Sequence, residues 1–339
     1  MKITKRLAIH TGFGMTSMAL PFLFGGFLQN KWLAVMGCFG ALILMYYVPV
    51  NKHVSMSQLL LIDIICIVSF PLSALVATNT LLAILWIGVV AFCVQYILSN
   101  NFLIGPQAFF ILMINGMLAS LTHLDFNMRF SLVGYAIMGI FIASLLAILE
   151  NTIFEKYPLT LKGIELHPSN LKPFFYSINY ALFGAIAYAI GYNLHLNNYY
   201  WVLVSAITVL QSENITIARH RQFHYIVAGI IGCIFALVIY VFIHLTFLLA
   251  LLSIIMMGLI CLTMPSSYLI GNLFTTPIAL ILFKLVRPEL GTNLILTRII
   301  AILLGTTIGV IGVLCFDTII KSKLMKKSMS KTYFLKFLI

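Results

Sequence analysis

Charged side chains are scarce in this sequence. Only 8% of its 339 residues are Asp, Glu, Lys or Arg, whereas soluble proteins average about 25%. Acidic residues are the rarer kind, with 8 Asp and Glu against 20 Lys and Arg, and the net charge is +12. Apolar residues make up 62% of the chain and the mean hydropathy is +1.09. This balance excludes an ordinary soluble fold and predicts an all-α integral membrane protein. Nucleic-acid binding is not expected, because most basic residues flank apolar runs.

The sequence also lacks the motifs of several kinds of chemistry. It has no Gly-rich loop ending in Lys-Ser or Lys-Thr, so we do not expect the chain to hydrolyse ATP. Its 6 cysteines all lie inside apolar runs, and no two have the spacing of a metal knuckle or a redox pair. We therefore expect no metal, no cofactor and no enzymatic activity.

Apolar runs of the length that crosses a bilayer, about 20 residues, recur twelve times. The first run follows Arg6 without a small-residue cleavage site, so we interpret it as a retained span rather than a signal peptide. The predicted spans are residues 7–28, 32–50, 58–77, 81–98, 102–121, 130–149, 174–194, 200–218, 225–242, 245–264, 269–286 and 299–316.

The basic residues predict the orientation of these spans. Cytoplasmic loops carry the excess of Lys and Arg, and most of the 20 basic residues fall on one side when both termini are placed inside. We therefore predict a multi-pass protein of the cell (inner or plasma) membrane with cytoplasmic termini. The Lys-rich tail, residues 318–339, is predicted to lie on anionic lipid headgroups.

The two halves of the chain repeat each other. Five matches follow in order at a spacing of 166 to 169 residues: Trp32 with Trp201, Cys66 with Cys233, Cys93 with Cys261, "FLIG" with "YLIG", and Arg129 with Arg298. An even number of spans in each half makes this a parallel repeat. The predicted architecture is a six-plus-six pseudo-dimer, with repeats at residues 1–149 and 173–317 joined by a cytoplasmic linker at residues 150–172.

The fifth and eleventh spans are interrupted at corresponding positions, which is the strongest sequence pointer to a transporter's binding region. Glycine and proline also occur in membrane helices for packing alone, and that interpretation stays open. The predicted substrate-binding or pathway residues in these spans are Gly105, Pro106, Gln107, Gly271, Asn272, Thr275 and Thr276.

A basic residue followed by histidine occurs between the second and third spans of each half. Lys52 and His53 match Arg219 and His220, and Arg221 follows. We predict that these five residues attract anions to an inner mouth, although charges that only set the topology would give the same pattern. Two polar residues just before the second cluster, Gln211 and Glu213, are added to the predicted pathway.

One acid lies inside a predicted span. Asp63 is in the third span, and the corresponding positions of the second repeat are Gly229 and Ile230, which are not acidic. Because an ionisable side chain in a span is a functional candidate by default, Asp63 is the predicted proton-coupling residue. Two other interpretations stay open: a charge partner for the side of Lys52 and His53, and an acid near a helix N-terminus that the dipole favours.

Three segments of the second half share a recognisable series of features: "YYWVLVSAITVLQS", "RHRQFHYIVAGIIG" and "RIIAILLGTTIG". A Tyr-Trp pair opens a span, a polar break follows, and a basic run leads into a Gly-rich helix. Over about residues 174–316 the chain resembles the fusaric acid resistance, or aromatic acid exporter, family. The matching positions are Tyr200, Trp201, Gln211, Arg219, Arg221, Gly229, Gly232, Arg298, Gly305, Thr306 and Gly309.

The resemblance implies export of organic, often aromatic, carboxylates across the inner membrane, driven by an ion gradient. Larger members carry a sizeable cytoplasmic domain, in whose place this chain has only the linker. The expected partner is a small organic anion, and a homo-oligomer remains open. Two other functions stay open as well: a passive anion channel, and a membrane-embedded enzyme of lipid or cell-wall metabolism that would use the outer pair His123 and Asp125.

Overall fold

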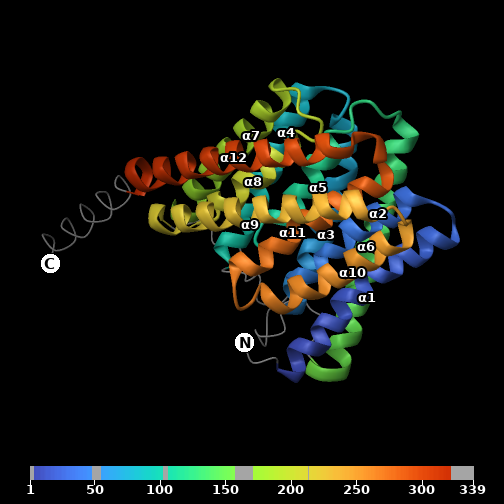
Figure 1. Ribbon diagram of the computed structural model, residues 1–339. Coiled ribbons are helices and arrows are strands. Elements are labelled where there is room, and N and C mark those ends of the chain that lie inside the picture. Colours follow the sequence, from blue (N-terminus) through green and yellow to red (C-terminus); the bar gives the residue numbers. More distant parts are fainter. Residues whose placement is uncertain (1–3, 48–54, 102–105, 157–170, 213, 322–339) are drawn as a thin grey trace, which may run out of the picture.

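The structure, a computed structural model, describes residues 4–47, 55–101, 106–156, 171–212 and 214–321. These residues form a bundle of helices (Figure 1) and contain no strand. Predictions at Lys52, His53, Gly105, Glu213 and most of the tail lie outside the described residues. The α-helices are α1 (Lys5–Phe27), α2 (Lys31–Ala41), α3 (Ser55–Val76), α4 (Thr80–Asn100), α5 (Phe109–Ala119), α6 (Phe126–Glu150), α7 (Leu171–Asn193), α8 (Tyr200–Leu210), α9 (Ile215–Phe242), α10 (Thr246–Thr263), α11 (Tyr268–Val286) and α12 (Gly291–Cys315).

Four short helical segments continue or precede these helices. The 3₁₀ helix η1 (Leu42–Tyr46) extends α2, and η3 (Pro288–Leu290) precedes α12. The π-helices η2 (Asn151–Glu155) and η4 (Phe316–Lys321) follow α6 and α12, which are the last helices of the two predicted repeats.

Nine helices in the described residues are long and apolar enough to cross a membrane: all α-helices except α2, α5 and α8. Each of these three has 11 residues, or about 16 Å of rise, against a hydrocarbon core of about 30 Å. The predicted spans 32–50, 102–121 and 200–218 are therefore not confirmed as full crossings. Span 200–218 is wrong as a single helix, because α8 ends at Leu210 and α9 begins at Ile215.

Asparagine side chains explain several of the helix starts. The Oδ1 atom of Asn30 accepts a hydrogen bond from the backbone of Leu33 at 3.0 Å, and that of Asn214 accepts one from Ile217 at 2.9 Å. Such N-caps satisfy backbone donors that have no partner inside the helix. The polar break before α9, noted from the sequence, is thus in part a helix start.

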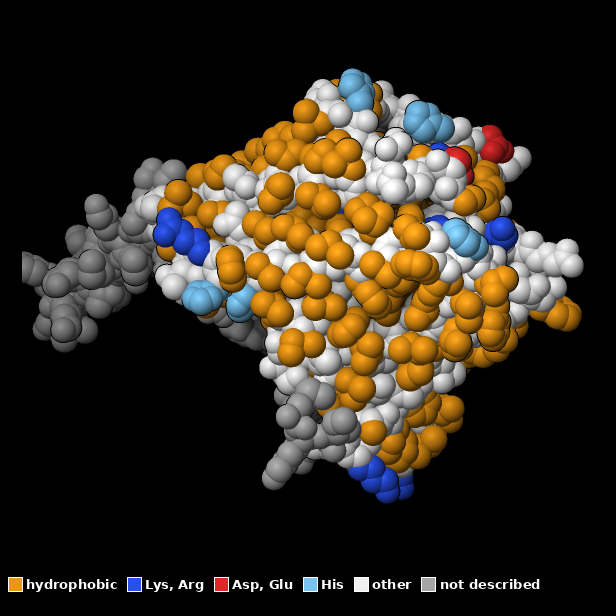
Figure 2. Space-filling model, viewed as in Figure 1, with side chains coloured by type: hydrophobic (Ala, Val, Ile, Leu, Met, Phe, Trp, Pro, Cys, Tyr) orange, Lys and Arg blue, Asp and Glu red, His pale blue; other side chains and the backbone are white. Residues whose placement is uncertain are grey.

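The three short helices lie inside the bundle. All eleven residues of α8 are buried, as are most of those of α2 and α5. Irregular backbone at membrane depth is tolerated only where protein surrounds it, and the long helices supply that shield. Hydrophobic side chains cover the flank of the bundle, and basic and histidine side chains lie toward its ends (Figure 2).

Helix packing follows the predicted repeat. Helix α2 packs on α1 and α6, as α8 packs on α7 and α12. Across the halves, α4 packs on α7 and α10 on α1, while α5 packs on α8 and α11 on α2. Exchanging the halves maps each pair onto the other. The close approaches also correspond: a Cβ at Gly139 would collide with the carbonyl of Gly37, and one at Gly305 with that of Val202. The twelve-span architecture itself stays a prediction, because three of its helices are short.

Candidate functional site

A small cavity lies at the centre of the bundle, where the two halves meet. Its volume is about 50 Å³, and α1, α2, η1, α5, α8, α10, α11 and α12 contribute to its wall. The wall is almost entirely apolar and aromatic. Its polar contributions come from Tyr200, Trp201, Thr275 and Arg298.

Arg298 is the one charged residue of this wall. Only 4% of it is exposed, although α12 is long and apolar enough to cross the membrane. Its Nη2 donates to the hydroxyl of Tyr225 at 2.9 Å, and its guanidinium lies 5.4 Å from the ring centre of Trp201. Among the described residues, its Nε has no hydrogen-bond partner and no carboxylate pairs with Arg298. A buried guanidinium with free donor capacity has the chemistry to bind an anion.

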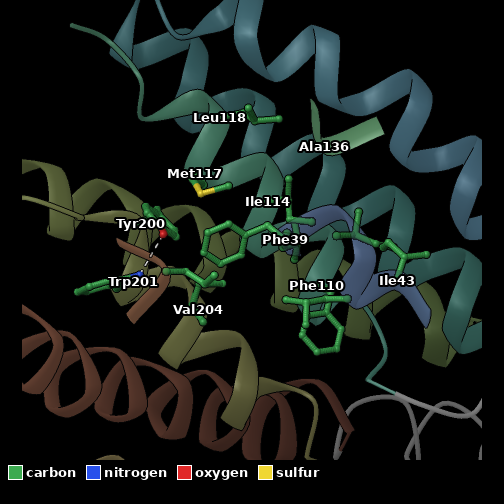
Figure 3. Packing of buried hydrophobic residues seen from close by; sticks show 14 of the residues in the cluster. Phe39, Ile43, Phe110, Ile114, Met117, Leu118, Ala136, Tyr200, Trp201 and Val204 are labelled. Carbon is green, nitrogen blue, oxygen red and sulfur yellow. Dashed lines mark hydrogen bonds between the residues drawn. The ribbon is translucent and has the colours of Figure 1, made fainter. Parts of the chain in front are cut away.

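The aromatic residues of α8 hold this arginine in place. Trp201 donates from Nε1 to the hydroxyl of its neighbour Tyr200 at 3.0 Å, and both are almost fully buried. Figure 3 shows this bond, with Phe39 of α2 beside Ile114 and Met117 of α5. The cavity thus combines one cation with aromatic and aliphatic surface.

A larger, polar cavity of about 700 Å³ opens where α3 meets α4, α7 meets α8, and α11 ends. We name this side of the bundle the loop end. The opposite side, where α1 and α7 begin and where α6 and α12 end, is named the terminal end. His123, His195 and Arg287 contribute to the wall of the polar cavity. Asp125, which the enzyme alternative pairs with His123, is not part of this wall.

The polar and central cavities are separated by a layer of aromatic side chains. A third cavity, of about 30 Å³, shares Trp32 and Arg287 with the polar cavity and shares Phe39 and Tyr200 with the central one. Phe283 closes the layer, with its ring centre 5.6 Å from those of Phe39 and Trp201. The three cavities therefore follow one another along the interface of the halves, and rings interrupt the path.

Of the predicted pathway residues, Thr275 lies in the wall of the central cavity and donates its hydroxyl to the carbonyl of Asn272 at 2.8 Å. Asn272 itself donates to the carbonyl of Tyr268. Gln107 has a left-handed backbone, with a φ of 47°, and its carbonyl accepts from the hydroxyl of Tyr46. Gly271 and Thr276 are buried in α11 outside the cavity walls described, Pro106 precedes α5, and Gln211 caps the end of α8.

The predicted inner-mouth residues of the second half lie within α9, not in a loop, because Asn214 starts this helix earlier than the sequence indicates. Arg219 and His220 are exposed there. Arg221 is half-buried, and its guanidinium lies 5.4 Å from the ring centre of Tyr268 at the start of α11. Their role in attracting anions stays a prediction.

Asp63 is buried in α3, where the hydroxyl of Ser144 on α6 donates to its Oδ2 at 2.6 Å. Its Oδ1 is buried and has no hydrogen-bond partner in the described part of the chain. Its predicted role in proton coupling stays a prediction. The same part of the chain holds no group of three His, Cys, Asp or Glu residues that could bind a metal.

Sequence reasoning missed three buried charged residues: Arg129, Glu150 and Arg298. The predicted spans that begin at residues 130 and 299 leave the two arginines outside, whereas α6 begins at Phe126 and α12 at Gly291. The predicted linker begins at Glu150, whereas Glu150 is the last residue of α6 and only 2% exposed. The match of Arg129 with Arg298 in the repeat was the available signal for the arginines; nothing comparable pointed to Glu150.

Residues 186–312 match the family model described as fusaric acid resistance protein-like, a region that runs from within α7 to near the end of α12. No curated protein and no solved structure matches the chain significantly. With its many apolar helices, the chain is a multi-pass membrane protein. The resemblance predicted from the sequence is confirmed: over residues 186–312 this chain is similar to the fusaric acid resistance family.

Proposed function

We propose that this protein exports organic anions, aromatic monocarboxylates in particular, across the cell membrane, driven by an ion gradient. The substrate passes along the interface of the two halves and binds in the central cavity. The two halves act as a six-plus-six pseudo-dimer, both termini are cytoplasmic, and the terminal end faces the cytoplasm.

The burial of Arg298 in the wall of the central cavity is the observation that carries this proposal. A charge placed within a span costs about 2.5–3.5 kcal/mol on insertion scales, and Arg298 has no carboxylate that compensates it in the described residues. A guanidinium can hold a carboxylate through two parallel hydrogen bonds. The rings of Tyr200, Trp201 and Phe110 supply apolar surface for an aromatic ring beside it. The family name, which refers to resistance to fusaric acid, points to the same class of substrate.

The size of the central cavity favours a transporter over an open channel. An apolar cavity of about 150 Å³ holds benzene, and the central cavity has about 50 Å³. An aromatic acid therefore enters only when the halves move apart. The rings of Phe39 and Phe283 close the path on the loop side, so the path is not open to the polar cavity.

The remaining residues predicted from the sequence take supporting roles. Arg219, His220 and Arg221, with Lys52 and His53, raise the anion concentration at the cytoplasmic mouth. Asp63 is the proton-coupling candidate predicted from the sequence. The basic tail, residues 318–339, binds anionic lipid headgroups.

Counterflow of radiolabelled benzoate in proteoliposomes tests the function. The wild-type protein is expected to exchange internal unlabelled for external labelled benzoate, and Arg298→Gln is expected to slow this exchange strongly at a benzoate concentration near the wild-type KM. Arg129→Gln is the matched control, because Arg129 is the repeat counterpart, is equally buried, and donates to the carbonyl of Ala74 away from the cavity walls described. Absence of exchange in folded wild-type protein, or equal loss in both variants, contradicts the proposal.

The same vesicles separate transport from passive conduction. A passive anion channel would give a benzoate current that follows the electrochemical gradient and shows no acceleration by benzoate on the opposite side. An exporter shows that acceleration, because the loaded protein returns faster than the empty one.

A further inference from the structure

An acid and a histidine are paired inside the bundle near its terminal end. The Nδ1 atom of His10 on α1 lies 3.1 and 3.2 Å from the two carboxylate oxygens of Glu150 on α6. The Glu150 side chain is 3% exposed and that of His10 12%. Both residues belong to helices that can cross a membrane. This is the one ion pair within such helices in the described part of the chain, because the other pair, Arg287 with Glu289, is exposed.

The acids at corresponding positions of the two predicted repeats make different contacts. Glu150 ends α6, and the corresponding acid, Asp317, lies just past the end of α12. Asp317 accepts a hydrogen bond from the backbone of Ile215 at 2.8 Å, at the start of α9. That contact satisfies a helix start and is structural. Glu150 instead faces an imidazole, the side chain whose charge changes near neutral pH.

Arg6, Tyr47, Cys261 and Asp63 are titratable or charged side chains on the elements packed around the pair. Arg6 is one turn before His10 on α1, and the ring centre of Tyr47, after η1, is 6.2 Å from that of His10. Cys261 on α10 interacts electrostatically with Glu150. Asp63 on α3 contacts α6 at Ser144, six residues before Glu150, which is about 9 Å along the helix.

We propose that His10 and Glu150 form the binding site for the proton whose inward movement drives export, an inference that rests on the proposed anion export. In the loaded state the proton lies on Nδ1 of His10, between the imidazolium and the Glu150 carboxylate, and the pair is neutral. In the unloaded state the proton has passed to water at the terminal end. The imidazole is then neutral, the carboxylate keeps its negative charge, and no other bond forms or breaks.

The position of the pair lets its charge affect the contact between the halves. Helix α1 packs against α10 of the second half. One turn beyond His10, Gly14 lies against the sulfur of Cys261, and Gly258 of α10 lies against Met15. A change of net charge at His10 and Glu150 therefore occurs beside the interface that must open for substrate to enter.

Two transport measurements on the purified full chain test the site, with labelled benzoate as the probe. One is counterflow at equal pH on both sides of the vesicle, and the other is benzoate movement against its gradient under an imposed pH gradient. Glu150→Gln and His10→Gln are expected to keep counterflow and to lose uphill movement. Asp317→Asn is the matched control, and is expected to keep both.

Three results would overturn the inference. Uphill movement that survives Glu150→Gln excludes the pair, and if Asp63→Asn alone abolishes it, the proton belongs to Asp63. Loss of counterflow along with uphill movement shows that the pair is only structural. If the wild type exchanges no benzoate, the proposed export fails separately, and the pair is then judged by histidine NMR. A His10 ring signal, assigned by its loss in His10→Gln, that shows no change of protonation at any pH at which the protein stays folded overturns the site.

Discussion

Removing the ring of Phe39 should open a leak between the polar and central cavities. Phe39 is 3% exposed and belongs to the walls of both the central cavity, of about 50 Å³, and the adjacent cavity, of about 30 Å³. Phe39→Ala joins these two spaces. It also removes the contact with Phe283, and an aromatic pair is worth about 0.5–1.5 kcal/mol beyond its buried area. If that contact opposes opening, benzoate should leak about 2- to 12-fold faster.

The assay is unidirectional efflux of labelled benzoate from proteoliposomes with no benzoate outside. Phe39→Ala also costs stability, about 3–5 kcal/mol for a buried Phe, so a control with the same loss is needed. Phe70→Ala supplies it, because Phe70 is fully buried in α3 and lies outside the walls of the described cavities. Equal leak rates in the two variants, or no increase in Phe39→Ala, would refute the idea that the aromatic layer closes the path.

Three further predictions concern single residues. Arg298→Gln should raise the KM of benzoate counterflow about 10- to 150-fold, because hydrogen bonds to charged groups are worth about 1.5–3 kcal/mol. A rise in KM below threefold would contradict a direct contact between Arg298 and benzoate. Gly305→Ala places a Cβ against the carbonyl of Val202 and should destabilise the protein by about 1–3 kcal/mol. The loss should appear as a lower melting temperature in detergent. An unchanged melting temperature would show that α8 and α12 can separate freely. Asn214→Ala removes the bond to Ile217 and should cost about 1 kcal/mol, with faster hydrogen exchange confined to the first turn of α9; uniform exchange changes would argue against a local cap.

The helical class and the nine long helices follow from hydropathy alone, because burial in lipid demands runs of apolar residues with internally satisfied backbone. The sequence could not distinguish a full span from a short helix inside the bundle. The segments at α2, α5 and α8 are as apolar as the others, yet their ends depend on single polar residues such as Asn30 and Asn214. Hydropathy averages over these residues, so it extended α8 across a break into α9.

The candidate site was harder to predict, because its chemistry depends on where helices begin. Thr275 was predicted from the interrupted eleventh span and lies in the wall of the central cavity. Arg298 was taken for a loop residue because a charge lowers local hydropathy and moves the predicted start of the span past itself. The same effect hid Glu150 at the end of α6. Charges that lie inside a span near its end are thus the residues that hydropathy most readily assigns to loops.

The two predicted repeats differ in the contacts of their buried charges. Arg129 and Arg298 are repeat counterparts and both are buried, but Arg129 donates to the backbone of Ala74 while Arg298 lies in the wall of the central cavity. The two corresponding acids differ as well: Asp317 accepts a hydrogen bond at the start of α9, and Glu150 faces His10. The arginine of the proposed anion site thus comes from the second half, and both residues of the proposed proton site come from the first. Helix α1 of the first half packs on α10 of the second. Movement between the halves is therefore the step that would couple proton movement to anion export. A variant that weakens the contact of Gly14 with Cys261 should disturb this coupling before it disturbs either site.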